Sequence, residues 1–279
     1  MKIGVSMFPT DLAIRPDQLA IELEDRGFES LFFPEHTHIP IGRRTPYPMG
    51  GELPEEYKRT FDPFIAVASA AARTRALTLG TGVCLLAQRD PIVLAKEIAS
   101  LDVLSGGRIV LGVGYGWNVD EMEDHGVDPR RRRDVLREKV LAMKALWTAD
   151  VAGFEGEFVR FEPSWSWPKP VQLPHPPVFL GGAAGPILFR HLVEWADGWM
   201  PIGGTGLSHT WPELRRVAEE HGRDPDSIEI NVFGARPDAG NLEHYRNIGV
   251  VRTCLALPSA PTDVVLPLLD KWAKLLQDG

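Results

Sequence analysis

Short apolar runs rich in β-branched residues alternate with longer amphipathic stretches along the whole chain. This alternation is typical of βαβ units, in which helices connect parallel strands. We predict strands over residues 3–7, 30–33, 77–81, 109–112, 178–180, 198–201, 228–232 and 250–255. We predict helices over residues 17–26, 63–73, 91–104, 134–147, 186–195, 211–221, 242–247 and 263–276.

The strict alternation of strands and helices predicts an α/β fold of the (β/α)8 TIM-barrel type. An open, doubly wound sheet is the alternative. Several predicted helices start as helices should, with Asp or Thr ahead of Pro or of an apolar face, at Asp62-Pro63, Asp90-Pro91 and Thr262-Asp263. A chain of 279 residues is ordinary for one barrel, so we predict a single domain over residues 1–279.

Two long connections interrupt the alternation, over residues 34–60 and 151–177. The second contains the run GFEGEFVRF, which has the pattern of a β-hairpin, followed by the Pro- and Trp-rich segment PSWSWPKPVQLPHPP. Connections of this length in a compact domain are usually lids, binding loops or contact surfaces. We therefore predict two insertions in the barrel that shape its substrate site.

Composition narrows the class of protein further. The net charge of −8 argues against nucleic acid or an anionic membrane as a partner. The first residues, MKIGVSM, have the pattern of a strand rather than of a signal peptide, and no apolar run reaches the roughly 18 residues of a membrane span. The two cysteines, Cys84 and Cys254, have no CxxC spacing. We expect a cytoplasmic protein without a disulfide framework.

The second predicted strand runs into PEHTHIP, which brings Glu35, His36 and His38 to the mouth of the barrel. A histidine there can hydrogen-bond a cofactor or pass a proton near neutral pH. Alternatively, these histidines satisfy loop backbone groups, or they bind a metal together with Glu35. Metal-dependent barrel hydrolases need His-x-His after the first strand, which here ends in MFPTD, so we expect no metal.

Glycines follow the third and fourth strands, in LTLGTGVCLL and RIVLGVGYGWNVDE. The absence of a side chain lets a planar ring or ligand approach the backbone closely. Gly112, Gly114 and Gly116 form G-x-G-x-G rather than the G-x-G-x-x-G of a dinucleotide fold. A tight turn between strand and helix is the structural alternative.

Two further glycine-rich turns, FLGGAAGP and PIGGTG, follow the fifth and sixth strands. Their candidate phosphate-binding residues are Gly181, Gly182, Ala183, Gly185, Gly203 and Gly204. Free backbone N–H groups and the positive end of the helix that starts at Pro186 favour an anion there. The turns therefore predict a phosphorylated cofactor. No P-loop lysine accompanies them, which argues against nucleotide hydrolysis.

Taken in order, the segments PEHTHIP, LTLGTGVCLL through GVGYGWNVDEMEDHGVDP, and FLGGAAGP through ADGW resemble the luciferase-like monooxygenase superfamily, in particular its coenzyme F-420-dependent branch. The resemblance covers nearly the whole chain. It implies a bacterial luciferase-like TIM barrel, a homodimer, and hydride transfer between the deazaflavin coenzyme F-420 and a small organic substrate. An FMN-dependent monooxygenase that uses oxygen and a non-catalytic cofactor-binding relative are the alternatives.

The resemblance also implies roles for individual residues. It places a non-prolyl cis peptide between Gly82 and Val83, in a bulge of the third strand that continues into Cys84, against the central ring of the cofactor. His36, with Glu35 beside it, matches the polar residues near the reactive ring edge. We therefore predict catalytic roles for His36 and Glu35 and cofactor contacts from the bulge.

The segment after the fourth strand carries both a match and a departure. The resemblance implies cofactor or substrate contacts from Gly114, Asp120 and Glu121. Trp117 aligns with the glutamate that acts as the acid in F-420-dependent sugar-phosphate dehydrogenases. We therefore expect no oxidation of glucose 6-phosphate, and we expect Trp117 to give the cofactor site an apolar or aromatic substrate face.

Overall fold

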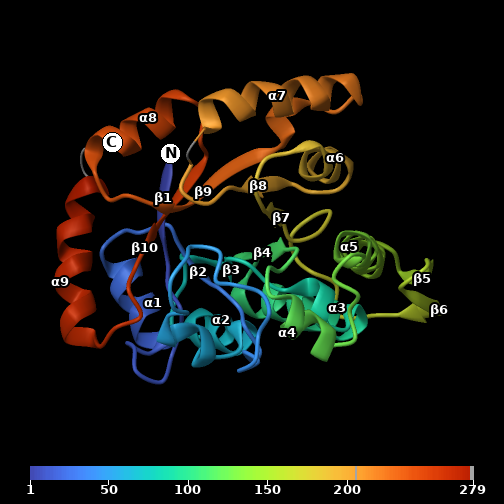
Figure 1. Cartoon of the computed structure of the whole chain (residues 1–279), viewed down its shortest axis with the longest axis horizontal. Coiled ribbons are helices and arrows are strands. Elements are labelled where there is room, and N and C mark those ends of the chain that lie inside the picture. Colours follow the sequence, from blue (N-terminus) through green and yellow to red (C-terminus); the bar gives the residue numbers. More distant parts are fainter. Residues whose placement is uncertain (205, 277–279) are drawn as a thin grey trace.

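The computed structural model describes residues 1–204 and 206–276. Parallel strands close into a barrel in the order β1-β10-β9-β8-β7-β4-β3-β2 (Figure 1). The barrel strands are β1 (Lys2–Ser6), β2 (Ser30–Phe33), β3 (Thr78–Thr81), β4 (Ile109–Gly114), β7 (Val178–Gly181), β8 (Gly198–Met200), β9 (Glu229–Ala235) and β10 (Arg252–Ala256). The predicted TIM barrel is confirmed, and the open sheet is excluded.

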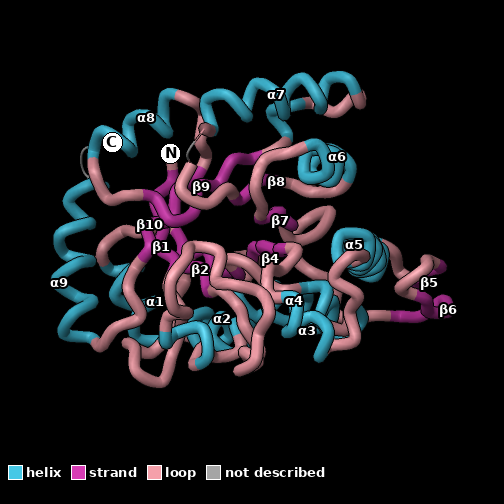
Figure 2. The backbone as a smooth tube through the Cα atoms, in the orientation of Figure 1, coloured by secondary structure: helices cyan, strands magenta, loops and turns pink. Residues whose placement is uncertain are grey.

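Helices surround the strands (Figure 2). They are α1 (Pro16–Asp25), α2 (Pro63–Ala71), α3 (Pro91–Ser105), α4 (Val119–Asp124), α5 (Arg132–Thr148), α6 (Pro186–Glu194), α7 (Leu207–Glu220), α8 (Ala239–Asn247) and α9 (Thr262–Ala273). The pattern of the sequence predicts each of them except α4. In the described part of the chain no helix is long and apolar enough to cross a membrane.

Two of the three predicted helix starts carry the expected cap. The carboxylates of Asp62 and Asp90 each accept hydrogen bonds from two backbone N–H groups in the first turn of α2 and α3. Such caps satisfy donors that the helix itself leaves without partners. The third prediction is wrong in detail, because α9 begins at Thr262 with Pro261 in the N-cap position and no side-chain cap.

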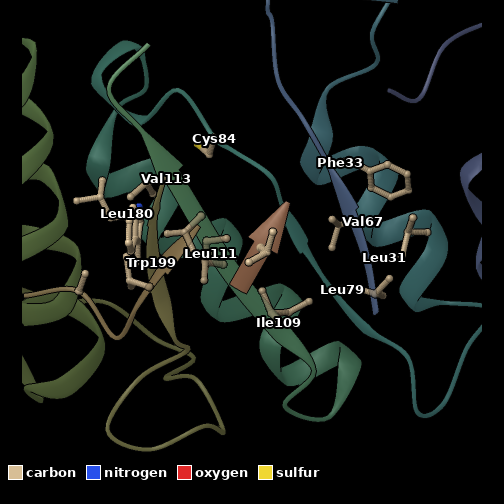
Figure 3. Close-up of a cluster of buried hydrophobic side chains, with 14 of the residues drawn as sticks. Leu31, Phe33, Val67, Leu79, Cys84, Ile109, Leu111, Val113, Leu180 and Trp199 are labelled. Carbon is tan, nitrogen blue, oxygen red and sulfur yellow. The ribbon is translucent and has the colours of Figure 1, made fainter. Parts of the chain in front are cut away.

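Apolar side chains fill both sides of the barrel wall. Inside the barrel, buried residues of six strands form one cluster: Phe32, Val110, Phe179, Met200, Phe233 and Cys254. Outside it, alternate strand residues such as Leu31 and Leu79 pack toward the helices, and Val67 of α2 lies beside them (Figure 3). Strands buried on both faces appear in a sequence as continuous apolar runs, which is why the runs could be recognised.

Both predicted insertions carry some structure of their own. Residues 34–60 contain a short 3-10 helix, η1 (Glu55–Lys58), and residues 151–177 contain the antiparallel hairpin of β5 (Val151–Glu155) and β6 (Arg160–Trp165). The predicted hairpin is confirmed, and it lies beside α5 (Figure 1). The first insertion packs against the segment after β4, through the contacts described below.

Candidate functional site

A buried pair of side chains lies at the carboxyl end of the barrel strands. His36 follows β2, and Glu121 belongs to α4, which follows β4. Nδ1 of His36 is 2.8 Å from Oε2 of Glu121, and the two side chains are 5% and 0% exposed. On the far side of the imidazole, the indole N–H of Trp117 donates to Nε2 of His36 at 3.3 Å. The structure thus joins His36 to two side chains that lie 81 and 85 residues away in the sequence.

Glu35, the predicted catalytic neighbour of His36, is engaged elsewhere. One carboxylate oxygen accepts the backbone N–H of Leu85 at 2.7 Å, and the other accepts Nε of Arg89 at 2.6 Å. Arg89 also reaches Asp62, the cap of α2. Glu35 therefore ties the segment after β3 to the end of β2. The carboxylate in contact with His36 is that of Glu121.

His38 lies away from this pair. Its Nε2 is 3.0 Å from a carboxylate oxygen of Asp124, and both side chains are exposed. The ring of His125 lies 5.2 Å away. Within residues 1–204 and 206–276, no group of three His, Cys, Asp or Glu side chains is arranged to hold a metal ion.

Aromatic rings lie around the buried His36 side chain. The Tyr57 ring lies 5.1 Å from His36 and 4.6 Å from Phe8. Tyr47 lies 5.3 Å from Tyr57 and 6.2 Å from Trp117. Burial raises the pKa of the Tyr57 hydroxyl, so this side chain stays uncharged. We did not single out Tyr47 and Tyr57 from the sequence, although the first insertion contains two of the chain's four tyrosines.

Asp120 faces the first insertion. Its carboxylate accepts the backbone N–H of Arg44 at 2.9 Å and Nε of Arg44 at 2.7 Å, and Thr45 Oγ1 donates to the same carboxylate. The hydrogen-bonded Arg44 guanidinium holds the pKa of Asp120 below its usual range. Arg44 also pairs with Glu123. Asp120, predicted to contact the cofactor, is thus placed as the anchor of the insertion on α4.

The segment after β3 has the backbone feature that the resemblance implies. The peptide bond between Gly82 and Val83 is cis. Cys84 is fully buried, and this burial raises the pKa of its thiol well above the usual range. A thiol that stays protonated and buried is a packing residue, so Cys84 contributes to the site through its position in the bulge.

Gly114 and Gly181 end β4 and β7 on either side of Val83. A Cβ atom on Gly114 would lie 2.5 Å from one methyl carbon of Val83, and a Cβ atom on Gly181 would lie 2.8 Å from the other. Neither distance is compatible with ordinary van der Waals packing. Gly114 thus makes room for Val83, whose side chain packs against the interior cluster of the barrel.

The two predicted phosphate turns lie on either side of one cavity of about 270 Å³. Its lining residues are Gly182, Ala183, Ala184, Trp199, Pro201, Ile202, Gly204, Leu207 and Thr210. Within the described residues, the backbone N–H groups of Ala183, Ala184 and Gly185 have no hydrogen-bond acceptor. Gly185 is also the N-cap of α6 and provides no side-chain cap. The cavity thus has the free donors that an anion needs.

Side chains from neighbouring elements hold both turns in place. The indole N–H of Trp199 donates to the carbonyl oxygen of Gly182 at 2.9 Å. The hydroxyl of Tyr245, from α8, donates to the carbonyl oxygen of Gly203 at 3.0 Å. With its carbonyl group fixed, the first turn keeps the N–H groups of Ala183, Ala184 and Gly185 available, whereas the N–H of Gly203 in the second turn donates to the carbonyl oxygen of Phe233 at 2.7 Å.

Buried polar atoms without partners lie after β4. Oδ1 and Nδ2 of Asn118 and Oε1 of Glu121 have no hydrogen-bond partner among the residues that the structure describes. Asn118 is 1% exposed, and we had not singled it out from the sequence. Buried polar groups are normally hydrogen-bonded, so these atoms are free to form hydrogen bonds with a bound ligand.

Comparison with known proteins supports a shared family. Residues 17–236 match the model of the luciferase-like monooxygenase family. An uncharacterized protein of Mycobacterium tuberculosis is 40% identical over 282 residues, covering 99% of each chain. The F-420-dependent glucose-6-phosphate dehydrogenase of Nakamurella multipartita is 31% identical over 79% of this chain and 61% of its own. The fold is similar to that of monooxygenase RslO1 from Streptomyces bottropensis, with TM-score 0.82, 22% identity and coverage of 100% and 99%.

Proposed function

Because the chain belongs to the luciferase-like monooxygenase family, we propose that it transfers a hydride between coenzyme F-420 and a small organic substrate. Membership makes it a flavin- or deazaflavin-dependent oxidoreductase, since relatives named for F-420 and for reduced FMN are both among its matches. The preference for F-420 rests on the relative that aligns with 79% of the chain, against 52% for the FMN-dependent one.

The observation that carries the proposal is the cavity between the two glycine turns, at the same end of the barrel as the His36–Glu121 pair. We assign the free N–H groups of Ala183, Ala184 and Gly185 to the cofactor phosphate. When bound, F-420 supplies a carbon that accepts or donates a hydride. The chain supplies orientation, exclusion of water and a proton site at His36.

The rings around His36 indicate the kind of substrate. Phe8, Tyr47, Tyr57 and Trp117 form an uncharged aromatic wall, and no carboxylate occupies the position of Trp117. Stacking and edge contacts with such a wall favour a flat apolar or aromatic molecule. A sugar phosphate, which needs charged and hydrogen-bonding partners, fits this wall poorly.

A homodimer is part of the proposal. Exposed apolar side chains gather on two neighbouring helices, with Ile65 on α2 and Ile92, Val93 and Leu104 on α3. Exposed apolar groups of this kind commonly mark a protein interface. Light scattering coupled to size-exclusion chromatography is expected to give twice the chain mass of 30.9 kDa, and a monomer at all concentrations would contradict this part.

The phosphate assignment can be tested with a charge. Ala184→Glu places a carboxylate at the cavity lining, where it repels a phosphate. We expect F-420 affinity to fall about 10- to 100-fold, which corresponds to about 1.4–2.8 kcal/mol. Asn247→Glu, at an exposed position that ends α8, carries the same charge change and serves as the matched control. Equal affinities of the two variants would contradict the assignment.

A further inference from the structure

We propose that Glu121 is a positioning residue that keeps the proton of neutral His36 on Nδ1, so that Nε2, which accepts the Trp117 indole N–H in this structure, is the basic nitrogen of the ring. The catalytic meaning of this arrangement rests on the proposed function. The tautomer itself is a property of the cofactor-free chain and can be measured without any cofactor.

The contact with Glu121 determines one end of the imidazole. An ionised carboxylate only accepts hydrogen bonds, so Nδ1 at 2.8 Å from Oε2 must donate. Both groups are buried, and the other carboxylate oxygen, Oε1, has no partner among the described residues. The imidazole is therefore the principal group that compensates this buried carboxylate.

The contact with Trp117 determines the other end. An indole N–H only donates, so Nε2 at 3.3 Å must accept. A neutral imidazole has one donor and one acceptor nitrogen, and the two neighbours demand the same assignment. The carboxylate, imidazole and indole thus form a directed chain that runs from the buried interior to the aromatic wall.

The neighbouring carboxylates do not share this role, because each is compensated by an arginine. Glu35 pairs with Arg89, and Asp120 pairs with Arg44. Within residues 1–204 and 206–276, no lysine or arginine forms an ion pair with Glu121. Separating a buried carboxylate from the group that compensates its charge costs free energy, so the position of Glu121 is coupled to that of His36. This distinguishes Glu121 from the acidic side chains that merely fasten loops.

The test is imidazole nitrogen NMR on the cofactor-free protein, recorded as the pH is raised until the nitrogen shifts of His36 no longer change. The wild-type protein is expected to show His36 with its proton on Nδ1 alone. Trp117→Phe removes the other neighbour that fixes the ring, and the proton is expected to stay on Nδ1. Adding Glu121→Leu to Trp117→Phe removes the acceptor as well and is expected to bring in a substantial population with the proton on Nε2. Asp124→Asn is the matched control, because Asp124 lies on the same helix and contacts the exposed His38. It is expected to leave the His36 signals unchanged.

The outcomes separate clearly. A wild-type spectrum with the proton on Nε2 overturns the proposal without any variant. So does a proton that moves to Nε2 in Trp117→Phe alone, or one that stays on Nδ1 in the folded variant carrying both Trp117→Phe and Glu121→Leu. If the double variant does not fold, the first two measurements still test the proposal.

A kinetic measurement separates positioning from binding. At saturating F-420, hydride transfer by Glu121→Leu is expected to be about 10- to 100-fold slower than in wild type, the loss found when a carboxylate that orients a histidine is removed. If the wild-type protein does not bind F-420, the proposed function is contradicted, while the tautomer result stands. Equal transfer rates with a shifted tautomer would contradict the positioning role.

Discussion

Glu29 and Arg252 form a bidentate ion pair at the amino-terminal end of the barrel, opposite the candidate site. Nε of Arg252 donates to Oε2 of Glu29 at 2.8 Å, and Nη2 donates to Oε1 at 2.8 Å. The Arg252 side chain is 4% exposed and that of Glu29 is 24% exposed. Lys2 lies 3.3 Å from the same carboxylate. Because this pair joins β10 to the start of β2, its loss is expected to destabilise the closed barrel.

The magnitude follows from the pKa of Glu29. Burial alone would raise this pKa, but the hydrogen bonds and charge of Arg252 outweigh burial and lower it from 4.5 to about 2. At about 1.36 kcal/mol per pH unit, this difference corresponds to roughly 3 kcal/mol of folding stability. Solvent screening of the partly exposed carboxylate reduces the expected value to about 2 kcal/mol.

A pH series of urea unfolding curves measures this contribution. Since the folded-state pKa is depressed, the stabilisation is complete above the unfolded value of 4.5 and is lost as the pH falls from there toward about 2. Glu29→Gln resembles the protonated side chain. We therefore expect wild type to exceed Glu29→Gln by about 2 kcal/mol above roughly pH 5, and the difference to shrink toward zero near pH 2.

A surface pair provides the control for this experiment. Glu157→Gln removes a carboxylate that pairs with Arg131 while 61% exposed, and such exposed pairs contribute at most about 1 kcal/mol. A difference between wild type and Glu29→Gln that stays constant from pH 7 to pH 2 would refute the linkage argument. Because the pair lies at the end of the barrel remote from the glycine turns, Glu29→Gln is expected to bind cofactor like wild type.

Three further predictions concern the mouth of the barrel. Asp120→Ala releases the Arg44 anchor, so limited chymotrypsin digestion is expected to cut the first insertion several times faster than in wild type, and an unchanged rate would argue against the anchor. Gly114→Ala is expected to lower the free energy of unfolding, measured by thermal unfolding, by about 1–3 kcal/mol because the new Cβ overlaps Val83. Adding Val83→Ala to this variant is expected to restore most of the loss. A double variant that regains no stability would show that the strain lies elsewhere. Trp117→Glu is expected to gain measurable glucose 6-phosphate oxidation, whereas turnover by wild type would contradict the alignment at this position.

The fold was accessible from the sequence because the signals that specify it are local. Barrel strands are buried on both faces and appear as apolar runs, and Asp62 and Asp90 mark their helix starts directly. The short helix α4 was missed because its sequence, VDEMED, is acidic and too short to show an apolar period. Its position after β4 nevertheless determines where Glu121 meets His36.

The site was only partly accessible for the same reason. The glycine turns and His36 are recognisable locally, but the contact between His36 and Glu121 spans 85 residues. Sequence adjacency favoured Glu35, whose carboxylate the fold directs to Arg89 instead. Likewise, the run GVGYG alone does not show that the Val83 side chain fills the space beside Gly114. These assignments depend on tertiary packing.

The central claim, that this barrel is built for coenzyme F-420, is tested most directly by equilibrium titration of the cofactor-free protein with F-420 and, separately, with FMN. Trp199 lines the proposed phosphate cavity, so binding is expected to quench tryptophan fluorescence. We expect saturable, tight binding of F-420 and binding of FMN that is at least tenfold weaker. Tight binding of FMN without binding of F-420 would contradict it.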